Sequence, residues 1–536
     1  MNTRARAREG REDFLDGEWH RLHPATPFLR GGVALIAIFA FVIANLREQL
    51  FESIIPGIVG APGHGNDDPI GFVVERGYLV FALLGVAALL LVLIGAFYLS
   101  WRMHSFRITD EVVEVRSGVI FRTNRKGRLD RIQGINITRP VIARLFGAAK
   151  LEVNVAGQDA NVQLYYLGSA TADALRAEIL RLASGVRGVA IDGVAPAAPA
   201  GPGTGDANAS LLDRRLAEFT APELDPELAA PESIVAMPIG RVIGSSALSG
   251  GLVLLILIAI LAGVGAVLGI LLGGDVGLLP ALAPVLLGFI PGLIAVGSYS
   301  ISRLVKSLRF TVASTPDGVR IGYGLLSTTN ETLPPGRIHS ISISQPLLWR
   351  PFDWWEVKVN RAGTSSAQGA GGRQNTTILP VGPRADAFRV LELVLPSLAA
   401  PEVAARVSAG LDRGTPDDGY TASPRRAVVL RWFSWRRNGF ALLPDAVLVR
   451  RGAVWRELVI VPAARMQSVA VTQGPLARRL RLAVVHPHTV AGPISARLGA
   501  LDADDAARFF RDAAALGVAA ADHDRSHHWR ADRNGA

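Results

Sequence analysis

Three arginines occupy the same position in a sequence pattern that occurs three times. Arg131, Arg337 and Arg465 each precede an alternation of apolar residues, and another arginine follows 13 positions later. A planar guanidinium group with several N–H donors suits a carboxylate or phosphate ligand. In the alternative, structural role, each arginine bonds to loop carbonyl groups and fixes the fold. We favour the structural role, because threefold repetition preserves an architecture as readily as a function. The same two interpretations apply to the residues two positions later, which are Gln133, His339 and Gln467.

A second candidate site is a segment rich in arginine and aromatic residues. Between Arg425 and Arg481 the chain has 12 arginines and 2 acidic residues, so this segment has the same formal charge, +10, as the whole chain. Such a surface suits anionic lipid headgroups, an acidic protein or nucleic acid. The residues expected to contact a membrane surface are Trp432, Trp435, Arg436 and Arg437. Alternatively, Trp435 closes the bottom of a folded module and the arginines are solvated.

Other reactive groups are scarce. The chain contains no cysteine, which excludes disulfides and thiolate chemistry. The paired histidines, at 486 and 488 and at 527 and 528, have no carboxylate cluster at the spacing of metal ligands. No Gly-x-Ser-x-Gly nucleophile motif occurs. We therefore expect no catalytic residue, no cofactor and no metal site, and we disfavour an enzyme.

The three arginines belong to three copies of one module. A glycine precedes each arginine by 13 residues, namely Gly118, Gly324 and Gly452. An aromatic residue opens each copy, namely Phe106, Phe310 and Phe440. Alternating apolar residues predict about seven short strands per copy. A helix closes each copy, at Thr171–Leu182, Arg384–Leu395 and Asp502–Leu516, the last with Asp502 as its N-cap.

Four long apolar runs lie beside the modules, at Gly31–Leu46, Tyr78–Ser100, Ala247–Gly273 and Leu278–Ile301. A helix that spans a bilayer needs about 20 apolar residues, so we expect four membrane spans. Basic residues follow the second and fourth runs, whereas 47–77 and 274–277 contain few. The positive-inside rule therefore places both termini and all three modules on the cytoplasmic side.

These patterns define the expected organisation of the chain. In order, it is a cytoplasmic tail (1–28), transmembrane hairpin 1 (29–101), repeat 1 (104–184), a flexible linker (185–240), transmembrane hairpin 2 (247–301), repeat 2 (306–397), a second linker (398–424), repeat 3 (425–517) and a tail (518–536). The linkers are assigned from their content of Ala, Pro and Gly.

Residues 109–147 contain the pattern Thr-Asp-Glu … Ser-Gly … Arg-Ile-Gln … Arg-x-Phe-Gly. This pattern resembles the bacterial pleckstrin-homology-like (PH-like) domain of membrane proteins of the YdbS/YdbT type. The resemblance weakens in repeat 2, where His339 replaces glutamine, and in repeat 3, where Leu480-Arg481 replaces the Phe-Gly step. The resemblance implies a seven-stranded barrel capped by a C-terminal helix, placed beside pairs of membrane helices. It implies no catalytic reaction.

The sequence thus predicts an α+β membrane protein with four transmembrane helices in two hairpins and three cytoplasmic PH-like β-barrels, each capped by a C-terminal helix. The expected location is the bacterial cytoplasmic (plasma) membrane. The expected function is non-enzymatic: the three modules form a scaffold or a lipid- or protein-binding unit at the membrane face. Expected partners are anionic lipids of the inner leaflet and a protein, one candidate being a smaller PH-like membrane protein. Nucleic acid is not expected. The alternative is a subunit of a membrane transport, envelope-stress or antimicrobial-resistance complex, although the apolar runs lack the ionisable groups that transport usually requires.

Overall fold

The computed structural model describes residues 17–23, 26, 79–118, 122–156, 161–184, 235–248, 250–271, 291–292, 294–302, 304–305, 307–315, 318–324, 327–334, 336–361, 376–398, 400–412, 414–415 and 418–524. The chain divides into two compact units. The first contains residues 1–129, 139–152 and 162–176, and the second contains the remaining residues.

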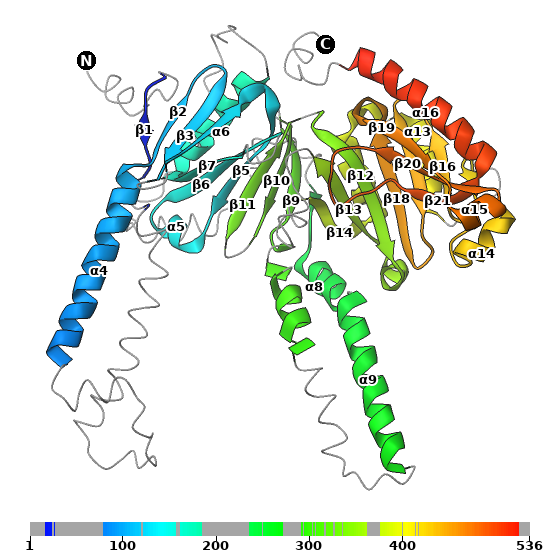
Figure 1. Cartoon of the computed structure of the whole chain (residues 1–536), viewed down its shortest axis with the longest axis horizontal. Coiled ribbons are helices and arrows are strands. Elements are labelled where there is room, and N and C mark those ends of the chain that lie inside the picture. The colour runs from blue at the N-terminus through cyan, green and yellow to red at the C-terminus, as the bar shows by residue number, and fades with distance from the viewer. Residues whose placement is uncertain are drawn as a thin grey trace. The chain divides into compact units, whose positions relative to one another are not determined.

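The described residues form three successive sets of seven strands, one set for each module (Figure 1). Module one has β1 (His20–Arg21), β2 (Ser105–Ile108), β3 (Val112–Ser117), β4 (Thr123–Arg128), β5 (Ile132–Arg139), β6 (Ala148–Val155) and β7 (Val162–Gly168). Module two has β8 (Val235–Ala236), β9 (Thr311–Thr315), β10 (Gly318–Tyr323), β11 (Thr328–Leu333), β12 (Ile338–Pro346), β13 (Trp354–Arg361) and β14 (Thr377–Pro383). Module three has β15 (Thr421–Ala422), β16 (Gly439–Leu442), β17 (Ala446–Arg451), β18 (Trp455–Pro462), β19 (Ser468–Thr472), β20 (Leu482–His488) and β21 (Leu498–Asp502).

The glycine that recurs in each module forms the hairpin between the third and fourth strands. Gly118, Gly324 and Gly452 all have positive φ, at 107°, 106° and 81°. A side chain is disfavoured in this conformation. It would also collide with the turn, because a Cβ at Gly324 would lie 2.0 Å from the Ser327 carbonyl oxygen. The glycine repeat is therefore explained by backbone geometry.

The first strand of each module is only two residues long, and an inserted segment separates it from the second strand. β1, β8 and β15 pair antiparallel with β2, β9 and β16. In modules one and two the insertion contains the long apolar runs, with helices α4 (Leu79–Arg102), α8 (Ile239–Ala247) and α9 (Gly250–Leu271). In module three the insertion is short and contains a 3-10 turn (Arg425–Ala427) and helix α14 (Val428–Arg431).

The sheets run from one module into the next, which the sequence did not indicate. The strand orders are β1-β2-β3-β4, then β7-β6-β5-β11-β10-β9-β8, then β14-β13-β12-β18-β17-β16-β15, and finally β19-β20-β21. The fifth strand of one module therefore pairs with the fourth strand of the following module. The physical reason is that an open strand edge has unpaired N–H and C=O groups, which a neighbouring edge satisfies.

Helices complete each module. The predicted closing helices are present as α6 (Ser169–Ala183), α12 (Arg384–Val394) and α16 (Ala503–His523). Asp502 is the N-cap of α16, as expected, and its carboxylate accepts from the Asp504 backbone N–H at 3.0 Å. Short helical segments follow the fifth strands, namely α5 (Val141–Leu145), a 3-10 helix (Leu347–Phe352) and α15 (Pro475–Arg479).

The segment 398–424 is not the flexible linker that its composition suggested. It contains helix α13 (Pro401–Leu411), whose Val407 and Leu411 are fully buried. These side chains share a core with Leu448 and Leu458, on strands β17 and β18. Neighbouring residues of the same strands face the opposite way, into a core that contains Phe440 and Phe509. The strands are apolar on both faces, so a covering helix keeps the outer face from water.

The membrane architecture expected from the sequence is contradicted. Within the described part of the chain, no helix is both long enough and apolar enough to cross a membrane. The first expected span, 31–46, and residues 272–290 lie outside the described residues. This finding overturns the expectation of four membrane spans. It also overturns the multi-pass location and the orientation, which were derived from those spans.

Residues 19–22 are part of module one, although the sequence assigned 1–28 to a tail. Residues 20–21 form β1, and Leu22 is buried. Trp101 Nε1 donates to the Leu22 carbonyl at 3.1 Å. The Arg116 guanidinium lies 4.0 Å from the Trp19 ring centroid. Strand pairing and these contacts hold the segment on module one.

Candidate binding surface

The four residues expected to form a membrane-surface contact lie in different environments. Trp432 is 66% exposed, and Arg436 is also exposed. Trp435 is half-buried and packs against the small core formed by Ala427, Leu482 and Ala500. Arg437 is only 4% exposed. The structure therefore divides the group into an outer pair and an inner pair.

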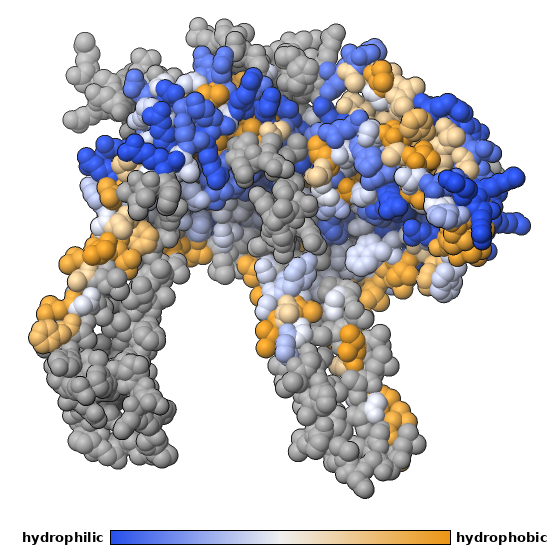
Figure 2. All heavy atoms as spheres, viewed as in Figure 1, coloured by the Kyte–Doolittle hydropathy of each residue, from blue (hydrophilic) through white to orange (hydrophobic). Residues whose placement is uncertain are grey.

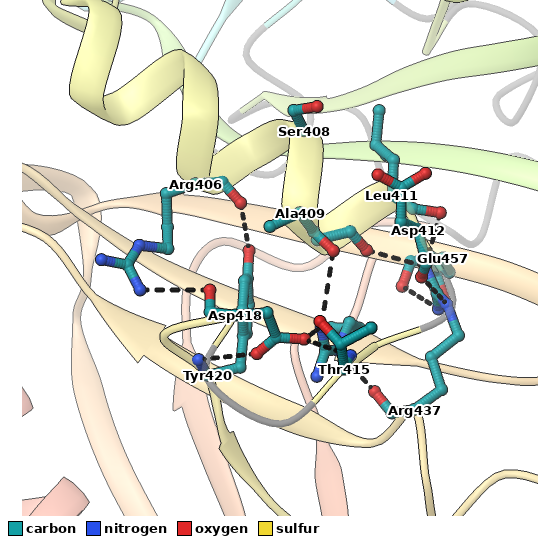
Figure 3. A network of polar contacts seen from close by, with 12 residues as sticks. Arg406, Ser408, Ala409, Leu411, Asp412, Thr415, Asp418, Tyr420, Arg437 and Glu457 are labelled. Carbon is teal, nitrogen blue, oxygen red and sulfur yellow. Dashed lines mark hydrogen bonds and ion pairs between the residues drawn. The ribbon is translucent and has the colours of Figure 1, made fainter.

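Arg437 holds α13 against the sheet of module three (Figure 3). Its Nη2 donates to the Gly410 carbonyl at 2.8 Å, and its Nε donates to the Asp412 carbonyl at 3.0 Å. Its Nη1 reaches the Glu457 carbonyl at 3.2 Å. The last carbonyls of a helix lack partners within the helix, and a cation satisfies them. Burial, together with the nearby charge of Arg450, lowers the pKa of Arg437 to about 9, so the side chain is still charged at pH 7. Arg437 thus stabilises the fold and is not available to a surface ligand.

Arg450 forms the second part of the same network, together with Asp418 and Tyr420. It is 1% exposed, and its Nη1 lies 2.5 Å from Asp418 Oδ2. Its Nε donates to the Arg437 carbonyl at 2.7 Å. Its guanidinium lies 4.3 Å from the ring centroid of Tyr420, whose hydroxyl donates to the Arg406 carbonyl at 3.0 Å. Burial alone would raise the pKa of the Asp418 carboxyl, but hydrogen bonds from Arg450 and from backbone N–H groups lower it overall. The network connects α13, the loop that follows it and β17.

An apolar and aromatic surface lies on the insertion of module three. We call Val429, Trp432 and Phe433 the aromatic cap. Val429 is 68% exposed, and the rings of Trp432 and Phe433 stack with centroids 3.4 Å apart. Exposed apolar side chains that form a contiguous patch with a polar rim often mark an interaction site. Leu476 on α15 is also exposed.

Exposed arginines lie on the insertion that carries the cap and on α15, and both segments pack on the small core of Ala427, Leu482 and Ala500. The exposed ones on the insertion and α15 are Arg425, Arg426, Arg431, Arg436, Arg478 and Arg479. Arg436 lies 5.4 Å from the Trp435 ring centroid, and Arg426 Nε donates to the Leu480 carbonyl at 2.9 Å. In Figure 2, hydrophobic and strongly hydrophilic residues adjoin where α14 and α15 lie. This surface combines apolar side chains with a dense positive charge.

The repeated arginines lie where the modules join. Arg337 Nη2 donates to the Asp130 carbonyl at 2.9 Å, and Arg465 Nη2 lies 2.8 Å from Asp524 Oδ2. Burial and the charge of Arg465 lower the pKa of Arg337. Arg131 is exposed, and its carbonyl accepts from the Ala156 N–H at 2.9 Å. Arg337 thus contacts a backbone carbonyl group of the 3-10 turn Leu129–Arg131, which precedes β5.

The polar residues that follow these arginines differ in burial. Gln133 is buried and donates to the Arg131 carbonyl at 3.3 Å, whereas Gln467 is exposed. His339 is half-buried. Burial and the charges of Arg465 and Arg337 lower the pKa of His339 to about 4. His339 is therefore neutral at pH 7.

Two buried contacts between distant segments were not anticipated. Arg361 forms an ion pair with Glu331, and both side chains are almost fully buried. Asn360 Nδ2 donates to the Ile494 carbonyl at 2.7 Å, and Asn360 Oδ1 accepts from the Ile494 N–H at 3.0 Å. The residue types did not indicate these contacts, because charged and amide side chains are mostly exposed.

A family model described as "Bacterial PH domain" matches residues 59–183, 251–398 and 387–516. No curated protein and no solved structure matches the chain. The three matched regions cover more than half of the 536 residues and contain every strand except β1 and β8. The chain belongs to the bacterial PH domain family.

Proposed function

We propose that the protein is a non-enzymatic scaffold whose third PH-like module binds the surface of an anionic lipid bilayer. The observation that carries this proposal is the aromatic cap, which is exposed and lies on an insertion that also carries exposed arginines. Tryptophan favours the interface between water and lipid. Each basic residue near an anionic surface contributes about 1 kcal/mol.

The position of the cap in the module supports the proposal. The cap lies between β15 and β16, which is where modules one and two carry their long apolar runs. Each module therefore places apolar residues at the same point of its fold. In module three the apolar segment is short, and charge compensates for the smaller apolar area.

The buried network gives the cap a rigid support. Arg437 follows Trp435 by two residues, and its guanidinium is held by carbonyl groups of α13, Asp412 and Glu457. Because the backbone next to the cap is held in place, less entropy is lost when the exposed side chains are immobilised on binding. The network thus serves binding without contacting the ligand.

The test is flotation of the full chain with vesicles. The full chain is needed because the outer face of β17 and β18 shares its core with α13 and module two. Binding is measured on vesicles with about one third anionic lipid and on neutral vesicles, at low and high salt. We expect binding to need anionic lipid and to weaken with salt, because exposed charges are screened.

Matched charge variants make the test specific to the surface. Arg436→Glu with Arg478→Glu reverses the charge of one exposed arginine on the insertion and one on α15. We expect a loss of at least about 2 kcal/mol, or roughly 30-fold in affinity. The control is Arg508→Glu with Arg511→Glu, which makes the same charge change on exposed positions of α16. Equal losses in both variants, or binding that ignores lipid charge, would refute the proposal and would favour an acidic protein as partner.

A further inference from the structure

The chain joins its modules twice by the same strand pairing. β5 of module one lies next to β11 of module two, and β12 of module two lies next to β18 of module three. In each case the fifth strand of one module meets the fourth strand of the next. Because the same junction occurs twice in one chain, we attribute it to the structure that the modules share.

The register of this junction can be counted from the repeated arginines. At the second junction, a residue n positions after Arg337 lies opposite the residue n + 1 positions before Arg465. The observed pairs are Ile341–Ile460, Ser342–Val459 and Ile343–Leu458. The same rule places Gly134 opposite Leu333 at the first junction. There, a Cβ on Gly134 would lie 3.4 Å from Leu333 Cδ2. Both junctions are therefore consistent with one register.

Two strands of the described chain correspond to the strands of this junction but pair with no neighbouring module. β4 is the fourth strand of module one and ends its sheet, and β19 is the fifth strand of module three and ends its sheet. The burial of the strands depends on whether they form a junction. All of β11 is buried, whereas every residue of β4 except Gly127 is exposed. Ser468, Val471 and Thr472 of β19 are exposed as well.

We infer that β19 of one copy pairs antiparallel with β4 of a second copy, so that the chains assemble head to tail. We choose a second copy as the partner because β5 and β12 each pair with the fourth strand of a following module. β4 is the corresponding fourth strand of module one. Such a contact joins two different surfaces, so repetition gives a ring if the rotation closes and a filament if it does not.

The rule also gives the pairs expected between the two copies. Val469 lies opposite Lys126, Ala470 opposite Arg125, Val471 opposite Asn124 and Thr472 opposite Thr123. Basic residues often protect an edge strand from pairing. On β4, however, Lys126 Nζ lies 2.6 Å from Glu114 Oε1 of the neighbouring strand. A charged fourth strand is also compatible with a junction, because Glu457 of β18 accepts from Ser342 Oγ of β12 at 2.8 Å.

The absence of cysteine makes cross-linking a direct test. Two full-length variants with one cysteine each are mixed and oxidised: Thr472→Cys with Thr123→Cys, and Val471→Cys with Asn124→Cys. Neighbouring antiparallel pairs alternate between close and wide Cα spacing, so at least one of these mixtures has the geometry for a disulfide. The control mixture, Ser468→Cys with Thr123→Cys, is four residues out of register, or about 13 Å.

We expect the better in-register mixture to form the disulfide-linked heterodimer at least about tenfold faster than the control. We also expect the mass of the unmodified chain, measured by light scattering, to rise with concentration. Val471→Lys should reduce this assembly because it places a further positive charge opposite the basic β4, whereas Val518→Lys, at an exposed position of α16, should not. Cross-linking that is independent of register, or a chain that remains monomeric at tens of micromolar, would overturn the inference.

Discussion

The buried pair of Arg450 and Asp418 allows the most quantitative prediction. Their side chains are 1% and 7% exposed, and the charged atoms are 2.5 Å apart. Removing one partner of a buried ion pair leaves an uncompensated charge and costs about 3–5 kcal/mol. We expect Asp418→Asn to cost about 3 kcal/mol, the lower end, because the amide oxygen still accepts a hydrogen bond from Arg450.

A second aspartate on the same loop provides the matched control. Asp412 forms an ion pair with Arg384 at 2.9 Å, but its side chain is 59% exposed. An exposed pair contributes below about 1 kcal/mol. Urea unfolding, followed by tryptophan fluorescence, measures the free energy of unfolding of both variants. If Asp418→Asn destabilised the protein no more than Asp412→Asn, the network would not hold α13 on the sheet.

The same pair predicts a dependence of stability on pH. The pKa of the Asp418 carboxyl is lower in the folded protein than its ordinary value. The contribution of Asp418 is therefore fully present above the ordinary pKa, near 4, and is lost as the pH falls through the lower, folded pKa. The difference in stability between the wild type and Asp418→Asn should shrink below about pH 4. A difference that stays constant down to pH 2 would contradict this assignment.

Two further predictions concern the repeat. Gly324→Ala forces a side chain into positive φ and toward the Ser327 carbonyl oxygen, so we expect a loss of about 1–3 kcal/mol in urea unfolding, whereas Gly474→Ala, at a position with open space, should cost less than about 1 kcal/mol. His339 has a pKa of about 4 in the folded protein, below its ordinary 6.5, so its contribution is fully present above about pH 6.5 and is lost as the pH falls toward 4. His339→Gln should remove this part of the pH dependence, measured as the urea midpoint between pH 4.5 and 7, and an unchanged profile would show that His339 titrates normally.

The internal architecture of the modules was largely predictable because it depends on local rules. The spacing of Gly118, Gly324 and Gly452 predicted a hairpin, and all three have the positive φ that such a turn requires. The closing helices followed from apolar periodicity, and the side chain of Asp502 caps the last one. Phe106 is fully buried in the first half of its module.

The joints between modules were not predictable in the same way. The pairing of β5 with β11 depends on which two strand edges come together. The pattern of apolar residues determines which face of a strand is buried, but it does not identify the strand that pairs with its edge. The 398–424 segment was interpreted as a linker from composition, although Val407 and Leu411 lie four residues apart, which is one face of a helix. Apolar residues at successive positions of β17 and β18 could have indicated that both faces are covered.

The candidate surface shows the limit of composition most clearly. Arg436 and Arg437 are neighbours in the sequence, yet the first is exposed and the second is buried among carbonyl groups. Successive residues point in different directions, and only the packing of α13 determines which direction is outward. Charge counted along the sequence therefore overestimates the charge that a ligand meets.

The most direct test of the proposed lipid contact is quenching of Trp432 by brominated anionic lipid. Trp432→Phe keeps an apolar ring, so the affinity for anionic vesicles should change little. We expect brominated vesicles to quench the wild-type fluorescence and Trp432→Phe to lose most of that quenching while it remains bound. Equal quenching in both proteins would show that another tryptophan meets the lipid and would contradict the assignment of the aromatic cap as the contact surface.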